Sequence, residues 1–410
     1  MWRILLALFS VALCSAVAVA EPQFPRLFGM NIGNKNYDDA AYQKQLARLD
    51  IVILGFYRGW QPVAGYRAAD AVRDIRAENP NLLLGQYTIL NEARDVLGDA
   101  AKRDVVTKIT QSDWWLRNAR GKRVQWTRRY SAWEVNFTRW AKPDSNGERY
   151  PQWSAQRDYK VFFKHIPQLS IWYTDNVMYR PRVRADWNGD GIKDSPDAPH
   201  VLASWRQGYR DWWDSIREVA PERLIIGNVD SDLSQPEFSG QLDGAFLEAL
   251  MGKPWSLERK KGWSAMMERY RAVEANLRGP RIVAFNVWGN PEEYQFFRYA
   301  FTSCLMRNGY FSFTDESRGY SSVPWFDEYD LKLGRATTPP PARPWVKSVW
   351  RRDFEHGVVL VNPGGEAVKV TLEAGWRHIR GRQAPELNSG RPVTGVVIPP
   401  RDGVVLERDA

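Results

Sequence analysis

Eight short apolar runs alternate with amphipathic stretches over residues 27–314. Such runs are typical of parallel strands that are buried on both faces of a sheet. The stretches between them repeat apolar residues at the period of a helix that buries one face. The expected strands are residues 27–33, 50–56, 81–88, 171–177, 223–229, 243–250, 281–288 and 309–314.

Eight strands that alternate with helices over this length predict an α/β fold, the (β/α)8 TIM barrel. An open doubly wound sheet is the alternative, but no glycine-rich phosphate loop follows the first run. A long insertion at residues 89–168 interrupts the repeat, with helical patterns at 99–110 and 154–165 and a strand pattern at 133–137. The other expected helices are residues 38–49, 66–78, 201–219, 257–277 and 291–307, the last of which opens at Pro291.

The pattern changes after a proline-rich stretch at residues 339–344. Beyond it, strand patterns lie between Gly and Pro turns and no helical pattern occurs, which predicts a small C-terminal antiparallel β domain. Its expected strands are residues 357–362, 367–373 and 393–398. The expected organisation is a signal peptide at residues 1–20, a catalytic barrel at 21–336, a linker at 337–344 and a β-sandwich-like domain at 345–410.

Residues 1–20 have the pattern of a cleavable signal peptide. Arg3 precedes an apolar run at residues 4–17, and the small residues of Ala18-Val19-Ala20 precede a cleavage site. The run is too short to span a bilayer as a helix. Cys14 would carry a lipid anchor only after a small residue, and Leu13 precedes it. We therefore expect a secreted or periplasmic chain without a membrane span.

Composition narrows the class of partner. The chain has 57 Lys and Arg against 48 Asp and Glu, a formal net charge of +9, and the basic residues are scattered. This argues against nucleic acid and favours an anionic polysaccharide as the partner of an exported chain. Export removes Cys14, so Cys304 remains alone and no internal disulfide can form. We expect a monomer that packing stabilises.

The active site of such a barrel lies at the C-terminal ends of its strands. Those ends carry carboxylates, amides and aromatic rings, whereas the four His residues lie elsewhere. A His-based triad or a His-rich zinc site is therefore disfavoured. Carboxylates beside Trp and Tyr suit a sugar, whose bond cleavage needs two carboxyl groups. We expect substrate contacts from Asn31, Tyr57, Trp60, Tyr87, Asn176, Asn228, Asp230, Asn286, Trp288 and Asp315.

Two carboxylates stand out because an apolar strand leads straight into each, Asp175 and Glu248. A carboxylate at the end of a buried strand is costly to desolvate unless it is paired or used. Asp175 is therefore either the cap of a turn or a catalyst. Glu248 either forms a salt bridge with an interior Arg or is the second catalyst.

Residues 173–176 (Tyr-Thr-Asp-Asn) and 243–248 (Asp-Gly-Ala-Phe-Leu-Glu) resemble strands four and six of glycoside hydrolases of the α-galactosidase-like clan and of the endo-polygalactosaminidase type. The resemblance covers the layout of the whole barrel, and a small C-terminal β domain is common there. It implies that Asp175 is the nucleophile and Glu248 the general acid/base. The clan has Asp on strand six, so the separation of the two carboxyls decides between retention, at about 5 Å, and inversion, beyond about 6.5 Å.

Residues 186–194 (Asp-Trp-Asn-Gly-Asp-Gly-Ile-Lys-Asp) carry oxygen ligands at the spacing of a calcium loop, with Asp197 where such loops have Glu. One interpretation is a structural calcium ion held by Asp186, Asn188, Asp190 and Asp194. The other is a tight Asx- and Gly-rich turn without a metal. No cofactor is required in either case.

The leading hypothesis from the sequence is an exported glycoside hydrolase that acts on a poly- or oligosaccharide. The alternative is a non-catalytic carbohydrate-binding or scaffold protein that keeps the barrel. A metal-dependent hydrolase or deacetylase is disfavoured because no His stands at the strand ends. Four aromatic residues of the insertion either pack it or extend the sugar subsites: Trp114, Trp115, Trp126 and Tyr130.

Overall fold

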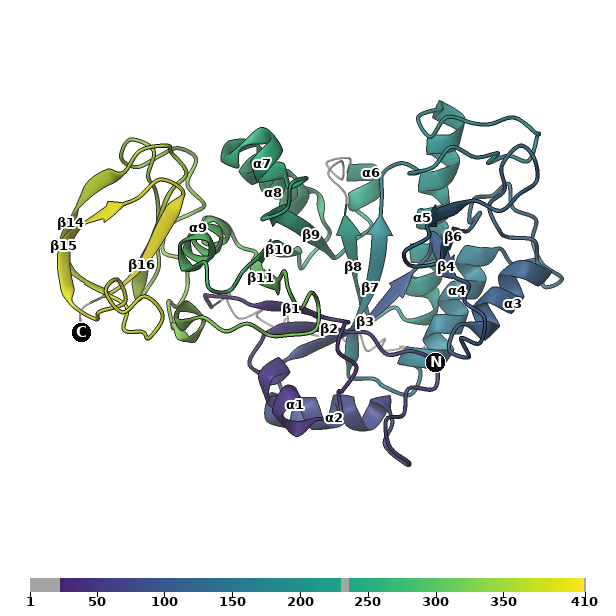
Figure 1. Ribbon diagram of the computed structural model, residues 1–410, viewed down its shortest axis with the longest axis horizontal. Coiled ribbons are helices and arrows are strands. Elements are labelled where there is room, and N and C mark those ends of the chain that lie inside the picture. Colours follow the sequence, from purple (N-terminus) through teal and green to yellow (C-terminus); the bar gives the residue numbers. More distant parts are fainter. Residues whose placement is uncertain (1–22, 230–235, 409–410) are drawn as a thin grey trace, which may run out of the picture.

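The computed structural model describes residues 23–229 and 236–408. The expected signal peptide at residues 1–20 and the predicted site residue Asp230 lie outside these residues. Figure 1 shows a central barrel with the insertion on one side and the C-terminal sheet on the other. Within the described part of the chain, no helix is both long enough and apolar enough to cross a membrane.

Eight parallel strands form the barrel and neighbour one another in chain order. The sheet closes where Leu27 pairs with Phe311 in parallel and the N–H of Phe311 donates to the carbonyl of Arg26 at 2.8 Å. The predicted (β/α)8 fold is confirmed, and each of the eight apolar runs overlaps one strand, with ends that agree to within two residues. The strands are β1 (Phe28–Asn31), β2 (Ile51–Leu54), β3 (Leu83–Ile89), β7 (Leu169–Val177), β8 (Leu224–Val229), β9 (Gly244–Met251), β10 (Ile282–Gly289) and β11 (Tyr310–Asp315).

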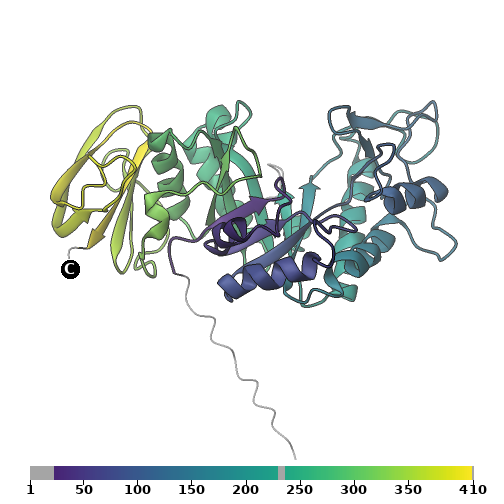
Figure 2. The same cartoon turned by 60° about the horizontal axis from the view of Figure 1, so that its bottom comes forward.

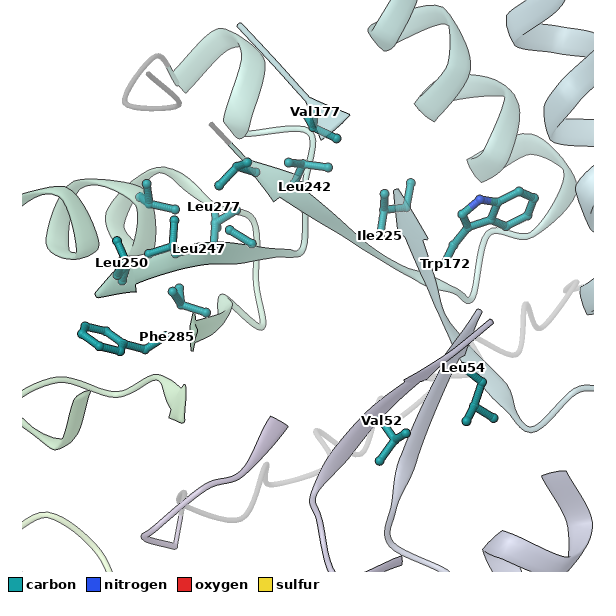
Figure 3. Packing of buried hydrophobic residues seen from close by; sticks show 14 of the residues in the cluster. Val52, Leu54, Trp172, Val177, Ile225, Leu242, Leu247, Leu250, Leu277 and Phe285 are labelled. Carbon is teal, nitrogen blue, oxygen red and sulfur yellow. The ribbon is translucent and has the colours of Figure 1, made fainter. Parts of the chain in front are cut away.

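Alternate residues of each strand face opposite sides of the barrel wall. In β2, Ile51 and Ile53 belong to the cluster inside the barrel, whereas Val52 and Leu54 belong to the larger cluster outside it. Figure 3 shows this larger cluster, with Val52, Leu54 and Trp172 labelled on their strands. The period of two determines which residue at each strand end faces the mouth of the barrel.

Helices cover the outside of the barrel, and one predicted helix is divided into two. The single helix expected at residues 257–277 is two helices, because Gly262 adopts a φ of 84° between them. Glycine takes this left-handed conformation without a steric penalty, and it ends the first helix. These helices are α1 (Ala40–Ala47), α2 (Ala68–Glu78), α5 (Pro199–Val219), α6 (Pro236–Ser239), α7 (Leu257–Lys261) and α8 (Trp263–Asn276).

Helix α9 (Tyr294–Leu305) begins later than predicted. Pro291 was expected to open it, but Pro291 lies in a turn in which Oδ1 of Asn290 accepts the N–H of Glu292 at 3.0 Å. The side chain of Asn290 thus forms an Asx turn that competes with the first helical turn.

The insertion between β3 and β7 folds into a lobe beside the barrel, on the side opposite the C-terminal sheet (Figure 2). Both predicted helices form, and the second continues as a π-helix at Tyr159–Phe163. The predicted strand is the centre of a three-stranded sheet, whose outer strands are too short to show an alternating pattern. Its other elements are β4 (Glu92–Arg94), α3 (Arg103–Gln111), β5 (Gln125–Thr127), β6 (Ala132–Glu134) and α4 (Tyr150–Asp158).

The C-terminal residues form a five-stranded antiparallel sheet. Its first and last strands were not predicted from the sequence. The sheet is attached to α9 by a buried ion pair between Arg298 and Asp402, at 2.7 Å. The predicted domain boundaries and linker stay predictions. The strands are β12 (Trp350–Asp353), β13 (Gly357–Asn362), β14 (Val368–His378), β15 (Pro392–Ile398) and β16 (Asp402–Arg408).

Candidate active site

One amide nitrogen joins the two carboxylates that the sequence singled out. Nδ2 of Asn228 donates to Oδ1 of Asp175 at 2.9 Å and to Oε2 of Glu248 at 3.0 Å. The three residues lie on β7, β8 and β9, which are neighbours in the barrel. Because both hydrogen bonds start from the same nitrogen, the two oxygen atoms lie at most about 5.9 Å apart, the sum of 2.9 and 3.0 Å.

Strand alternation explains why these three side chains meet. Side chains two positions apart on a strand face the same side of the sheet. Each of the three therefore continues a column of side chains that faces the barrel interior. The interior residues two positions earlier are Tyr173, Ile226 and Phe246.

A residue in the left-handed region directly follows each carboxylate. The φ of Asn176 is 51° and that of Ala249 is 48°. The pairing of β7 with β8 and of β9 with β10 is interrupted at the same places. This conformation costs a residue such as Ala249 about 1–2 kcal/mol. Bulges and strain of this kind concentrate at active sites, where they redirect a side chain.

Two tyrosine hydroxyls complete the hydrogen bonding of the carboxylates. Tyr87 donates to Oδ2 of Asp175 at 2.5 Å, and Tyr320 donates to Oε1 of Glu248. Burial raises the pKa of Glu248 above its usual value, and the hydrogen bonds from Tyr320 and Asn228 oppose that rise. A raised pKa keeps Glu248 protonated over a wider pH range, as a general acid requires.

A second charged network lies beside Asp175. Arg182 donates from Nε to Oε1 of Glu134 at 2.7 Å and from Nη2 to Glu92, and its guanidinium lies 3.8 Å from the ring centroid of Trp126. Glu134 is fully buried, and this burial raises its pKa to about 7. Burial also raises the pKa of Glu92, with a smaller contribution from the charge of Asp175. The network therefore holds a third carboxylate, Glu92, at the mouth.

The carboxylates open into a cavity of about 1640 Å³. Four aromatic side chains on its wall are between 40% and 54% exposed: Tyr57, Trp126, Tyr130 and Trp255. The rings of Trp126 and Tyr130 are stacked with their centroids 6.4 Å apart. Exposed rings around a polar centre provide flat apolar faces and fixed polar groups in one site.

Four of the predicted substrate-binding residues line this cavity, together with Asp175 and Glu248. Two of the four, Tyr87 and Asn228, contact the carboxylates directly. The four residues are Tyr57, Tyr87, Asn176 and Asn228.

Asn31 and Asp315 do not line the cavity, because each faces away from the barrel interior. The inward residue of β1 is Met30, so Asn31 points outward and donates to the Tyr42 hydroxyl at 3.2 Å. Asp315 accepts the N–H of Ser317 at 2.8 Å and so closes its own turn.

Trp60, Asn286 and Trp288 also lie off the cavity wall. Trp60 is 5% exposed and donates to the carbonyl of Lys35. Asn286 is fully buried and accepts the N–H of Ala249 at 3.0 Å, next to Glu248. The ring of Trp288 packs edge-on against Tyr320 at 5.1 Å. Asn286 and Trp288 thus contact neighbours of Glu248 without lining the cavity.

Two residues of the site were missed in the sequence, Trp255 and Tyr320. Glu92 stands just beyond the third strand, among the polar residues of the strand ends, but is not among the predicted substrate contacts. Trp255 lies shortly beyond β9, and its short distance from a strand end is a signal that would have found it. Tyr320 lies in the loop after β11, and nothing in the local pattern marks it. The insertion's aromatics are divided between packing and cavity, since Trp114 and Trp115 are buried.

In the loop at residues 186–194, carboxylates accept backbone N–H groups. Asp186 accepts from Gly191 at 2.8 Å, Asp190 from Ile192 at 2.8 Å and Asp194 from Trp187 at 2.8 Å. Asp197 is paired with Arg180. No group of three or more His, Cys, Asp or Glu arranged to hold a metal occurs in the described ranges. These hydrogen bonds form the Asx- and Gly-rich turn, and calcium binding stays a prediction.

The chain shows similarity to one protein family over part of its length. Residues 174–358 match the family model described as hypothetical glycosyl hydrolase family 15. The matched segment includes Asp175, Asn228 and Glu248. None of the curated proteins matches this chain.

Solved structures share the fold at low identity. Amy13B from Eubacterium rectale has a TM-score of 0.50 and 9% identity, over 94% of each chain. The glycoside hydrolase domain of PelA from Pseudomonas aeruginosa has a TM-score of 0.46 and 13% identity, over 74% of this chain and 98% of that chain. The GH36 α-galactosidase AgaA from Geobacillus stearothermophilus has a TM-score of 0.47 and 10% identity, over 94% of this chain and 56% of that chain. Taken with the match over residues 174–358, the chain resembles TIM-barrel glycoside hydrolases.

Proposed function

We propose that this chain is an exported glycoside hydrolase that cleaves a poly- or oligosaccharide with Asp175 and Glu248. The observation that carries the proposal is the hydrogen-bonded bridge from Asn228 to both carboxylates, within a cavity bordered by exposed aromatic rings. The match to a glycosyl hydrolase family supports the same class of reaction. The pattern of residues 1–20 supports export.

The spacing of the carboxylates supports a retaining reaction. Retaining enzymes hold the two carboxyl groups about 5–5.5 Å apart, and inverting enzymes about 6.5–9.5 Å apart to leave room for a water. The upper limit of about 5.9 Å between Oδ1 of Asp175 and Oε2 of Glu248, the sum of 2.9 and 3.0 Å, lies below the inverting range.

In the proposed reaction, Asp175 attacks the anomeric carbon while Glu248 gives its proton to the glycosidic oxygen. The bond to the leaving sugar breaks, and a covalent glycosyl ester of Asp175 forms. Glu248, now ionised, takes a proton from a water that attacks the same carbon. The ester bond to Asp175 then breaks, and both carboxyls return to their starting states.

The surrounding residues support distinct roles for the two carboxyls. Tyr87 and Asn228 each donate to Asp175 and hold its oxygen atoms in a fixed direction. Glu248 has a raised pKa because it is buried. A protein that only binds carbohydrate needs neither the close spacing nor the raised pKa, so both features favour the hydrolase over that alternative.

Hydrolysis assays with two isosteric variants test this function. The chain without residues 1–20 is incubated with a panel of microbial and plant polysaccharides, and reducing ends are measured. Asp175→Asn and Glu248→Gln should each lower hydrolysis by at least about 1000-fold, the order expected for removal of a reacting group. Glu366→Gln, an exposed change in the loop between β13 and β14, is the matched control. Full activity in either site variant contradicts the assignment.

The stereochemistry of the first product tests the retaining mechanism separately. Proton NMR spectra taken in the first minutes of hydrolysis show the anomer before mutarotation. We expect the configuration of the substrate bond to be kept. Release of the opposite anomer would show that a water attacks directly and that Asp175 is not the nucleophile.

A further inference from the structure

Two lysines, Lys35 and Lys102, face the cavity on the side of β1 to β3. Lys35 follows β1, and Lys102 stands at the start of α3. Both side chains are half-buried, and within residues 23–229 and 236–408 neither forms an ion pair. The ammonium of Lys35 donates to the carbonyl of Ile32. Two positive charges therefore lie on one wall of the cavity, and neither is paired with a carboxylate.

The positive charges of these lysines are unfavourable where they lie. Burial, and after it the charge of Lys102, lowers the pKa of Lys35 to about 8. Burial also lowers the pKa of Lys102, and the charge of Arg157 adds to this effect. An anion between the two ammonium groups would offset their repulsion and supply the negative partner that each lacks.

The carboxylates near Lys102 are already used by other groups. Asp104 and Asp158 are both paired with Arg157, at 2.9 and 2.7 Å. Asp99 accepts the N–H of Ala101 at 3.1 Å. These neighbours reduce the positive potential at Lys102 without forming an ion pair with it.

The lysine pair lies close to the proposed catalytic centre. The charge of Lys102 acts on Glu92, and the charge of Asp175 acts on Glu92 as well. Lys35, Lys102 and Asp175 line one cavity, so a glycan that places one sugar at Asp175 can extend along the same cavity towards the lysines.

The other end of the cavity is basic as well. Lys260 and Lys261 lie on its wall near Trp255. Among the described residues, seven Lys and Arg side chains line the cavity against five Asp and Glu. Three of the five acids are Glu92, Asp175 and Glu248 at the centre. A polyanion would therefore meet positive charge on both sides of the reacting bond.

We propose that Lys35 and Lys102 form a subsite for an acidic substituent of the bound glycan, a carboxylate or a sulfate ester. The substrate class is then an anionic polysaccharide. This inference rests on the proposed function, because it places the anion on a sugar next to the one held at Asp175. Two ammonium groups on one wall bind either oxyanion by charge-assisted hydrogen bonds.

Binding of matched acidic and neutral glycans tests this subsite. The probes are polygalacturonate and a sulfated galactan, alginate as a second polyuronate, and the same polymers after carboxyl reduction or desulfation. Isothermal titration calorimetry with the chain lacking residues 1–20 should show that at least one acidic polymer binds about tenfold or more tightly than its neutral derivative. The carboxylate and sulfate arms identify the acidic group.

The variants Lys35→Gln and Lys102→Gln should each lose about tenfold in affinity for that acidic polymer. Affinity for the neutral derivative should stay unchanged. Lys44→Gln, an exposed lysine of α1, is the matched control and should bind as the unaltered chain does. Unfolding temperatures show that the variants fold, and removal of one of two repelling charges should not lower them.

The outcome separates this inference from the proposed function. Binding that survives neutralisation of the glycan, binding to neutral glycans alone, or no binding to any acidic probe overturns the subsite. Tight binding of an acidic polymer without cleavage contradicts the hydrolase and leaves the subsite standing. Cleavage of a neutral glycan with unchanged rates in both lysine variants contradicts the subsite and leaves the hydrolase standing.

Discussion

Asp175 and Glu248 accept hydrogen bonds from the same atom, Nδ2 of Asn228. A single nitrogen between two carboxyls fixes their separation and their direction together. Each carboxyl has a second donor of its own, Tyr87 for Asp175 and Tyr320 for Glu248. Removal of the shared donor therefore affects both groups at once, whereas removal of either hydroxyl affects one.

Replacement of Asn228 should lower activity more than stability. Asn228→Ala is expected to lower kcat by about 10²–10³, the cost of losing a preorganised donor. Asn228→Asp should lower it further, because a third negative charge then lies between two carboxylates. Rates on the best polysaccharide of the panel give kcat, and circular dichroism gives the unfolding temperature.

Asn81→Ala, an exposed change before β3, is the control for a lost amide and should leave kcat unchanged. If Asn228→Ala kept more than half of the original kcat, the bridge between the carboxyls would have no part in catalysis.

Tyr320→Phe should move the alkaline limb of the pH–rate profile. The hydrogen bond from Tyr320 favours ionised Glu248 and so lowers its raised pKa. Without the hydroxyl the pKa of Glu248 rises further, and the general acid stays protonated to a higher pH. The limb in kcat/KM should move upward by about 0.7 pH unit, since a hydrogen bond contributes roughly 1 kcal/mol and a pKa unit is about 1.4 kcal/mol.

The profile of Tyr57→Phe is the control, because Tyr57 lies on the exposed edge of the cavity. Its limb should stay in place. An unmoved limb in Tyr320→Phe would mean that Glu248 is not the group whose deprotonation stops the reaction.

The barrel could be predicted because its signal is local and repeated. Each strand is an apolar run, and each helix between strands buries one face. Asp175 and Glu248 were found because an apolar strand runs directly into each of them. Asn31 and Asp315 were predicted from their position at a strand end alone, and the period of two would have excluded both, since their neighbours Met30 and Thr314 face the other side.

The contacts that complete the site could not be predicted, because they join distant parts of the chain. Tyr320 is 72 positions from Glu248, and Arg182 is 90 positions from Glu92. Their approach depends on the path of loops that carry no periodic pattern. The break at Gly262 is a different case, because a glycine within a helical pattern marks a C-terminus only when the chain turns there.

Arg182→Met should destabilise the fold strongly. Arg182 pairs with Glu134, whose side chain is fully buried, and with Glu92. Loss of the guanidinium leaves two carboxylates without a positive partner, at a cost of about 3–5 kcal/mol in the free energy of unfolding. Urea unfolding followed by tryptophan fluorescence measures the loss.

The double variant Arg182→Met with Glu134→Gln should recover a large part of that stability, because the fully buried Glu134 is then neutral and only the less buried Glu92 is left without its positive partner. Arg139→Met is the control, since its ion pair with Asp211 is exposed on the arginine side. Equal stability of the single and double variants would show that Glu134 is not charged in the native state.

Glu328 should make stability fall as pH rises through neutrality. Its side chain is buried where the barrel meets the C-terminal sheet and accepts a hydrogen bond from Tyr294. Burial raises its pKa from 4.5 to about 7. Between these values the folded chain binds more protons than the unfolded chain, so the contribution of Glu328 to stability is present below about pH 4.5 and lost as pH rises to about 7.

Glu328→Gln removes the titration while the amide oxygen still accepts from Tyr294. Calorimetry should therefore show equal unfolding temperatures at pH 5 and a higher one for the variant at pH 8, with the exposed Glu366→Gln as control. The same difference between pH 5 and pH 8 in the variant and the unaltered chain would mean that Glu328 keeps one protonation state throughout this range.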